Sequence, residues 1–345
     1  MFKIGEKQID EGKTYIIAEA GSNHNGKLSQ AEQLIDIAAE AQADAVKFQT
    51  FKASKLYLPN SGNADYLKTS KSVYQIIKEM EMPLDWLPHL VKYCEKRKID
   101  FLSTPFDKES ASALNNVGVP AFKIASYSLS DIPLIKYISS FGKPLIVSTG
   151  AGTMNEVKET VNLLKKNHID FALLQTVAKY PAPLEATNLK VLDTFRDSFN
   201  VAVGISDHST NHLVVPMASV ARGACILEKH FTLSREMEGP DHKFAVEPSE
   251  LKDMVIMIRL VEKALGDGKK RVDTYEKELA EFAKVAVHAV RNINIGDTFT
   301  EENIAVIRPG KVKRGISPKY FESILGKKSK RNIKISEGIR QGDFK

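Results

Sequence analysis

Eight short apolar segments separated by longer amphipathic ones constrain the fold of this chain more than any other feature. They are YIIAE (15–19), ADAVKFQ (43–49), IDFLSTP (99–105), AFKIAS (121–126), PLIVSTG (144–150), FALLQTV (171–177), VAVGISDH (201–208) and CILEKHFT (225–232). Runs of this kind predict buried strands, and the segments between them, such as LSQAEQLIDIAAEAQ (28–42), have the period of amphipathic helices. Alternating strand and helix units predict an α/β fold with a parallel sheet covered by helices.

The number of units indicates how the sheet is arranged. Eight strand-and-helix units in about 250 residues predict a (β/α)₈ TIM barrel, here over residues 1–266. A doubly wound open sheet is the alternative, but no Gly-x-Gly-x-x-Gly turn follows the first strand. The charged segment 267–281 is predicted as a linker or a solvated helix, and 282–345, with short apolar runs between turns, as a small β-rich domain.

Composition and charge narrow the class of protein. A chain of 345 residues that is 43% hydrophobic and 27% charged is typical of soluble globular proteins. We expect no membrane span and no secretory signal, hence a cytoplasmic protein whose Cys94 and Cys225 are reduced buried thiols. The net charge of +6 fits dispersed surface lysines or an anionic substrate; without an arginine-rich helix or a recognised motif, we expect no nucleic-acid partner.

Polar residues end nearly every predicted strand. In this architecture the catalytic groups come from the C-terminal ends of the strands, so these side chains are expected to converge on one ligand. The strand-end residues are Glu19, Lys47, Gln49, Ser103, Thr104, Lys123, Ser126, Ser148, Thr149, Ser206, Asp207, His208, Glu228, Lys229 and His230.

Two of these strand ends carry imidazoles, His208 and His230. They lie on the seventh and eighth strands, and neighbouring strands are about 5 Å apart, so both rings can reach one cation. Asp207, Asp241 and His242 are expected near them. Such an open site would act as a Lewis acid on a carbonyl.

Two strand-end lysines, Lys47 and Lys123, interrupt otherwise apolar strands. Lysine is almost never buried without a partner, so we expect an anion to meet them. Ser126 and Ser148, with the STGAGT turn (148–153), add donors suited to phosphate or carboxylate. The turn is equally explained by Thr153 capping the next helix, and the two interpretations are compatible.

Glu19 ends the first strand and precedes the polar loop GSNHNG (21–26). Its carboxylate is placed to steer a sugar hydroxyl or a proton, or else to pair with Lys47 on the next strand.

Nine motifs in order resemble the sialic acid synthase family, which condenses phosphoenolpyruvate with an N-acylated mannosamine-type sugar. They are IIAEAGSNHNG, ADAVKFQTF, FLSTPFD, FKIAS, IVSTG, KYPAP, GISDHS, EKHFTL and GPDHKFAVEP. The tail segment IRPGKVKRGISP resembles that family's antifreeze-like (SAF) domain. KIASY and VAKYPAP resemble the spore coat polysaccharide branch of the family.

The resemblance implies a role for each matching residue. His208 and His230 match the ligands of a Mn²⁺ or Mg²⁺ ion, and Arg308 matches an arginine that reaches the barrel of the other subunit in a domain-swapped homodimer. The phosphoenolpyruvate contacts match Lys47, Thr104, Lys123, Ser126 and Ser148. The sugar contacts match Glu19, Gln49, Tyr180 and Asp241. Without the resemblance, Arg308 is equally well interpreted as a surface residue in a basic turn.

The chain departs from the family pattern at two places. Tyr127 and Ser128 follow Ser126 where the family commonly has Gly and an acid, which leaves proton handling unassigned. Ala178 stands where a polar phosphate contact is expected.

Three questions stay open from the sequence. The acceptor is an N-acylmannosamine or a deoxy-diamino relative leading to legionaminic or pseudaminic acid, with loop 52–72 expected to shape the choice. A Schiff-base aldolase using Lys123 or Lys47 is a rival reaction. The non-enzymatic alternative is a sugar-binding protein that has lost catalysis.

Overall fold

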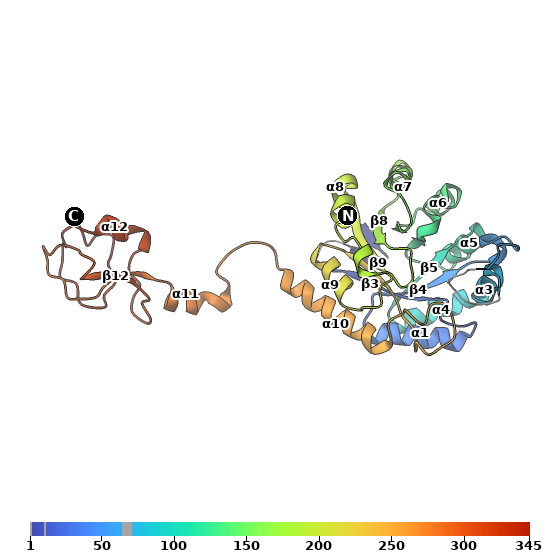
Figure 1. The fold of residues 1–345 in the computed structure, drawn as a ribbon, viewed down its shortest axis with the longest axis horizontal. Helices are drawn as coiled ribbons and strands as arrows, with labels where there is room; N and C mark the ends of the chain where they lie inside the picture. Colours follow the sequence, from blue (N-terminus) through green and yellow to red (C-terminus); the bar gives the residue numbers. More distant parts are fainter. Residues whose placement is uncertain (1, 10–11, 64–70) are drawn as a thin grey trace. The chain divides into compact units, whose positions relative to one another are not determined.

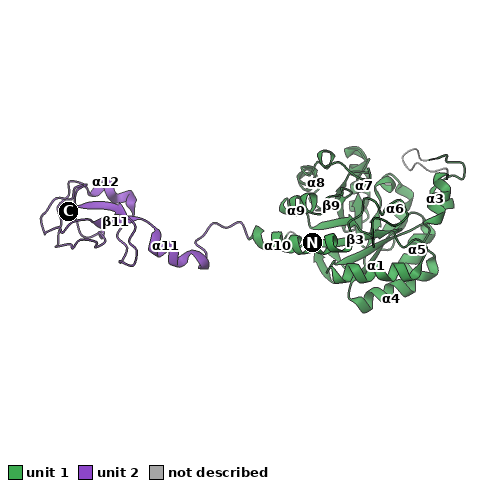
Figure 2. Ribbon diagram, turned by 60° about the horizontal axis from the view of Figure 1, so that its bottom comes forward, with its two compact units in different colours: residues 1–266 green, residues 267–345 purple. Residues whose placement is uncertain are grey.

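The computed structural model of the chain describes residues 2–9, 12–63 and 71–345. The chain divides into two compact units, Met1–Gly266 and Asp267–Lys345 (Figure 2). Each unit has a hydrophobic core of its own.

The first unit is built on eight parallel strands, with helices around them (Figure 1). The strands are β3 (Tyr15–Gly21), β4 (Ala45–Thr50), β5 (Asp100–Pro105), β6 (Phe122–Ile124), β7 (Leu145–Ser148), β8 (Phe171–Thr176), β9 (Ala202–Asp207) and β10 (Ile226–His230). Their order is β5-β4-β3-β10-β9-β8-β7-β6, and the two end strands, β5 and β6, lie in contact. The predicted barrel is confirmed, because this order follows the chain around a nearly closed ring.

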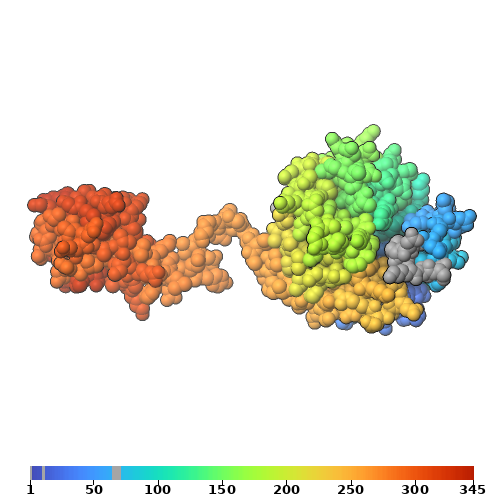
Figure 3. Space-filling model, viewed as in Figure 1, coloured from blue at the N-terminus to red at the C-terminus, as the bar shows by residue number. Residues whose placement is uncertain are grey.

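Helices follow every strand of the barrel. They are α1 (Leu28–Glu40), α2 (Ala53–Leu56), α3 (Val73–Glu79), α4 (Leu87–Arg97), α5 (Lys108–Asn116), α6 (Ile132–Ser139), α7 (Met154–Lys166), α8 (Val191–Phe199), α9 (Val214–Ala221) and α10 (Pro248–Leu265). The predicted cap of α7 is confirmed: Thr153 and Glu156 form a capping box that satisfies backbone donors at the helix start. On the face that Figure 3 shows, this unit has a rounded surface.

Two apolar layers hold the barrel together. The larger one lies between the strands and the helices. The smaller one lies inside the barrel, where a hairpin of β1 (Phe2–Ile4) and β2 (Lys7–Ile9) packs against inward-facing strand residues. We name this inner cluster the floor; it contains Phe2, Ile4, Ile9, Tyr15, Ile17, Ala45, Leu102, Ala121, Ile146, Ala172, Leu174, Cys225 and Ile226. No strand is predicted from the sequence over residues 2–9.

The second unit is small and rich in turns. Its elements are α11 (Lys277–Ala283), the antiparallel pair β11 (Ala286–Ala289) and β12 (Ile304–Ile307), and α12 (Phe321–Ile324). Its core is a set of buried apolar side chains that includes Val287, Phe299 and Ile333.

The cysteines and the absence of a membrane span were both predicted from the sequence. Cys94 and Cys225 are both buried, and Sγ of Cys225 donates to the carbonyl oxygen of Val203. Within the described ranges, no helix is long and apolar enough to cross a membrane.

Candidate active site

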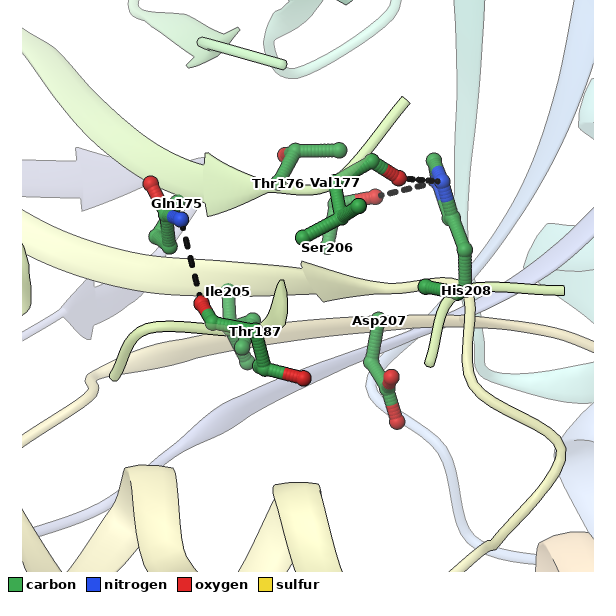
Figure 4. Close-up of a pocket in the computed structure, with 9 residues that line it drawn as sticks. Gln175, Thr176, Val177, Thr187, Ile205, Ser206, Asp207 and His208 are labelled. Carbon is green, nitrogen blue, oxygen red and sulfur yellow. Dashed lines mark hydrogen bonds between the residues drawn. The ribbon is translucent and has the colours of Figure 1, made fainter. Parts of the chain in front are cut away.

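Side chains at the C-terminal ends of β9 and β10 alternate between the inside of the barrel and the helix layer. Ser206 Oγ donates to Glu228 Oε1 at 2.8 Å, whereas Asp207 and Lys229, the next pair in the parallel register, form an ion pair of 2.6 Å. In Figure 4, Ser206 and the ring of His208 lie on one side of β9 and Asp207 lies on the other. The strand period of two therefore directs Glu228 and the imidazoles inward.

Lys47 lies at the centre of a buried charge cluster. Its ammonium nitrogen is 2.8 Å from Glu19 Oε2 and 3.6 Å from Glu228 Oε2, and it donates to Thr104 Oγ1 at 2.9 Å. The side chains of Lys47, Glu19 and Glu228 are each at most 4% exposed. Four strand ends thus contribute to one cluster, as the sequence predicted for the converging side chains.

Lys123 is the second cation of this cluster. Its ammonium group donates to Ser148 Oγ at 2.5 Å and lies 3.7 Å from Glu228 Oε1, so Glu228 stands between the two lysines. Ser126 is close by, because its Oγ accepts a hydrogen bond from the N–H of Gly150 at 3.0 Å. The structure therefore brings together every barrel residue predicted to contact phosphoenolpyruvate.

Burial and pairing set the protonation of this cluster. Burial raises the pKa of Glu19 to about 7, even though Lys47 opposes the shift. Burial would also raise the pKa of Glu228, but Lys123 and Lys47 outweigh it and hold the pKa at about 2. Burial lowers the pKa of Lys123 to about 8, and for Lys47 the two carboxylates outweigh burial and raise the pKa. Glu228 is consequently the permanent anion between two cations.

The rings of His208 and His230 lie next to this cluster, with centroids 5.5 Å apart. Nδ1 of His208 lies 2.7 Å from the carbonyl oxygen of Val177; donation to it leaves the lone pair on Nε2, which Ser206 Oγ meets at 3.4 Å. Burial lowers the pKa of His208 to about 4, and burial together with His208 lowers the pKa of His230 well below its ordinary value, so both rings are neutral near pH 7. Nδ1 of His230 is buried without a hydrogen-bond partner among the described residues.

Two neutral imidazoles with available lone pairs fit a divalent cation. Of the three side chains expected beside them, Asp241 lies next to His230, with its Oδ2 3.8 Å from Nδ1. Asp207 pairs with Lys229 on the opposite face of the strand, so its expected place beside the rings is wrong. Both ring nitrogens of His242 are engaged, by Thr232 and Asn25. In the described part of the chain, no group of three or more His, Cys, Asp or Glu side chains is placed to hold a metal.

Two residues predicted to contact the sugar, Gln49 and Asp241, lie next to Glu19 and His230. Gln49 Nε2 donates to Glu19 Oε1 at 3.1 Å, and Asp241 Oδ2 lies 3.8 Å from Nδ1 of His230. Gly21, with a φ of +53°, lies among them: a Cβ there would be 3.3 Å from Asp241 Oδ2 and 3.6 Å from Glu19 Oε1. A side chain would therefore intrude on the sugar-side residues.

Tyr180 covers the two imidazoles. Its ring stacks on His208 with centroids 4.1 Å apart and meets His230 edge-on at 5.6 Å. Phe244 packs against both Tyr180 and His230, so the imidazole pair has aromatic walls. A narrow crevice lies beside His208, between the ends of β8 and β9 and the segment that follows β8 (Figure 4).

The two departures from the family pattern meet in space. The hydroxyl of Tyr127 donates to the carbonyl oxygen of Ala178 at 3.0 Å, which links the segments after β6 and β8. Ser128 is half-buried in the same short helical turn as Tyr127. Arg308 lies in the second unit, directly after β12. Loop 52–72 includes residues 64–70, which lie outside the described part of the chain.

From the sequence, Glu228 is predicted only as one of the converging strand-end side chains, and Gly21 has no predicted role. A signal for Glu228 existed, because it precedes His230 by two positions and therefore shares its face of the strand. A signal for Gly21 was weaker: a glycine at the end of a strand is usually a turn residue.

Comparisons with known proteins agree over nearly the whole chain. Residues 34–270 match the NeuB family and residues 284–345 match the SAF domain. The N,N'-diacetyllegionaminic acid synthase of Campylobacter jejuni is 41% identical over 95% of this chain and 99% of its own length. The spore coat polysaccharide biosynthesis protein SpsE of Bacillus subtilis is 40% identical over 99% of this chain and 97% of its own length. The crystal structure of N-acetylneuraminic acid (sialic acid) synthetase from Leptospira borgpetersenii, in complex with citrate, superposes with a TM-score of 0.73 at 32% identity, covering 81% of this chain and 95% of that one.

Proposed function

Because this chain belongs to the NeuB family, we propose that it condenses phosphoenolpyruvate with the aldehyde form of an N-acyl amino sugar and releases phosphate. The observation that carries the proposal is the buried cluster in which Glu228 holds Lys47 and Lys123 beside two neutral imidazoles. Phosphoenolpyruvate carries a phosphate and a carboxylate, and two buried ammonium groups attract both. Thr104, Ser126 and Ser148 add donors around the lysines.

The proposed reaction forms a carbon–carbon bond at C3 and replaces the C2–O bond to phosphate by a C2–O bond from water. C3 of phosphoenolpyruvate attacks the aldehyde carbon, and the aldehyde oxygen takes a proton. Water adds to C2, and the tetrahedral intermediate loses phosphate to leave a 2-keto acid. The residues act mainly by holding the two substrates in contact.

Residues on the sugar side orient the acceptor and handle its proton. Glu19, with a pKa near neutrality, is the proposed donor to the sugar oxygen, while Gln49, Tyr180 and Asp241 hold the acceptor's hydroxyl groups. His208 and His230 would hold Mn²⁺ or Mg²⁺, which as a Lewis acid polarises a carbonyl oxygen. Ser128 carries no carboxylate, so the group that activates water is left unassigned.

The acceptor is proposed as an N-acylmannosamine-type sugar, giving a nine-carbon sialic-acid-like product. A deoxy-diamino sugar is the second candidate, because the relative named as an N,N'-diacetyllegionaminic acid synthase is 41% identical to this chain. Phosphate release from phosphoenolpyruvate, measured with a panel of both sugar types and with a pseudaminic acid precursor, distinguishes the acceptors. If no sugar leads to phosphate release, the result supports the rival hypothesis that this chain is a sugar-binding protein without catalysis.

Metal dependence is tested on the same assay. Chelation followed by dialysis is expected to abolish phosphate release, and added Mn²⁺ is expected to restore it. Full activity in the metal-free protein would contradict a role for a cation at the imidazole pair.

A Schiff-base aldolase is the second candidate reaction, because burial lowers the pKa of Lys123 to about 8. Borohydride added with pyruvate would label Lys123 covalently in an aldolase. We expect no label, since Lys123 is held by Ser148 and Glu228 instead of facing an open carbonyl site.

We further propose that the working unit is a domain-swapped homodimer in which Arg308 completes the partner's site. Mixing the inactive variants Lys123→Met and Arg308→Ala under subunit exchange gives heterodimers with one intact site. Activity is expected to return to about a quarter of the wild-type value, on statistical mixing. Mixtures that stay inactive, although heterodimers form, would contradict the swap.

A further inference from the structure

Lys229 is an almost fully buried lysine that faces away from the charge cluster of the site. It lies between Glu228 and His230 on β10, and its side chain is 1% exposed. Its ammonium group contacts Asp207 Oδ2 at 2.6 Å and the carbonyl oxygens of Ser209 at 2.5 Å and Asn211 at 3.1 Å. All of these partners belong to the segment 207–211, at the end of β9 and just after it.

Asp207 ties down the same segment from its own side. Its Oδ1 accepts the N–H of Ser209 at 2.8 Å, and its Oδ2 accepts the hydroxyl of Ser209 at 3.2 Å. His208 is thus held between two neighbours that are both bound to Lys229. Its ring also contacts the carbonyl oxygen of Val177 through Nδ1, Ser206 Oγ through Nε2 at 3.4 Å, and the stacked ring of Tyr180.

Stability alone is a weak reason for such a pair. A buried ion pair repays its desolvation only when the geometry is good, and apolar residues of similar volume often stabilise a protein as well or better. The place of the pair is more informative: it joins the strand that carries His230 to the segment that carries His208, directly behind both rings. Supporting residues of this kind commonly set the affinity of a metal site.

We propose that the Lys229–Asp207 ion pair is a positioning device that holds His208 at the correct distance from His230. The inference rests on the proposed function, in which these two rings bind a divalent cation. Neither residue touches substrate; both act through the backbone of segment 207–211.

The test uses the full-length double variant Lys229→Met/Asp207→Asn, which removes both charges and keeps an acceptor for the N–H of Ser209. Affinity for Mn²⁺ alone is measured by electron paramagnetic resonance, and turnover at saturating Mn²⁺ by phosphate release. We expect the variant to fold, to bind Mn²⁺ about 10- to 100-fold more weakly, and to turn over more slowly. A folded variant with wild-type affinity and turnover would overturn the proposal.

A second variant covers the case in which the double variant does not fold. Asp207→Glu keeps both charges and adds one methylene, so it displaces segment 207–211 without leaving a charge unpaired. It is expected to weaken Mn²⁺ binding, and unchanged affinity would overturn the proposal. The matched control is Arg259→Met, which removes the Arg259–Asp44 ion pair of 2.7 Å outside the site; it is expected to lower stability and leave Mn²⁺ affinity unchanged.

Failure of the proposed function gives a different result. Wild-type protein that neither binds Mn²⁺ nor releases phosphate rejects the function itself. In that case the crystal structure of the double variant still decides the inference: loss of the contact between Nδ1 of His208 and Val177 supports it, and an unmoved ring overturns it.

Discussion

The two ends of the barrel interior are built from the same strands and differ completely in chemistry. On β3 the inward residue Ile17 belongs to the floor, and Glu19, two positions later, belongs to the charge cluster. On β10 the corresponding pair is Ile226 and Glu228. One step of the strand period, about 7 Å, thus separates an apolar layer from a layer of buried ions.

The apolar floor and the charge cluster contribute differently to stability and to function. Side chains of the floor pack against each other and against the N-terminal hairpin, and a fully buried Ile stabilises by about 1.5–3 kcal/mol. The charge cluster keeps four ionisable groups away from water, which costs free energy that only their mutual pairing offsets. We therefore expect substitutions in the cluster to reduce activity and substitutions in the floor to reduce stability.

The largest effect is expected for Lys123→Met. Removing one buried cation that meets a developing negative charge lowers kcat/KM by about 10³-fold, equivalent to about 4 kcal/mol. The fold is expected to persist, because Lys47 still neutralises Glu228. Steady-state phosphate release measures the effect, and Lys158→Met, an exposed lysine on α7, is the matched control. Near wild-type turnover would remove the lysine pair from the proposed reaction.

The floor is tested by Ile4→Ala. Ile4 is fully buried in β1, so the cavity left behind is expected to lower the free energy of unfolding by about 3 kcal/mol. Urea unfolding measures the loss. Activity at a temperature where the variant is folded is expected to match wild type; a loss of kcat there would show that the two layers are not separable.

Asp241→Asn tests how the stability of the site depends on pH. Burial raises the pKa of Asp241 from 3.8 to about 6, so the folded protein favours its neutral form. Its stabilising contribution is complete below pH 3.8 and is lost as the pH rises to 6. Between these two pH values, the free energy of unfolding of the wild type is expected to fall by about 2 kcal/mol relative to that of the variant. Unfolding free energies measured at both pH values check this, and parallel pH curves would contradict it.

Tyr127→Phe is expected to have the smallest effect. It removes the hydrogen bond to Ala178, worth about 1 kcal/mol at most in so exposed a position. We expect KM for one substrate to change by less than about tenfold, with kcat unaltered. A large fall in kcat would instead place Tyr127 among the groups that touch the reacting atoms.

Several parts of this description were accessible from the sequence. The strand segments and the polar residues at their ends follow from the period of apolar residues and from the rule that barrels carry chemistry at one end. The convergence of Lys47, Lys123 and Ser148 follows from the same rule. The hairpin at residues 2–9 was missed, because two three-residue strands are too short to show a period.

The sequence by itself determined that Glu228 and His230 share one face of a strand and that Lys229 takes the other. Only the tertiary structure decided which face is the inside of the barrel. It therefore also decided that Asp207 pairs with Lys229 behind the site instead of joining the imidazoles. The physical reason is that alternation relates neighbours along one strand, whereas the direction of each face and its partners depend on how the sheet closes.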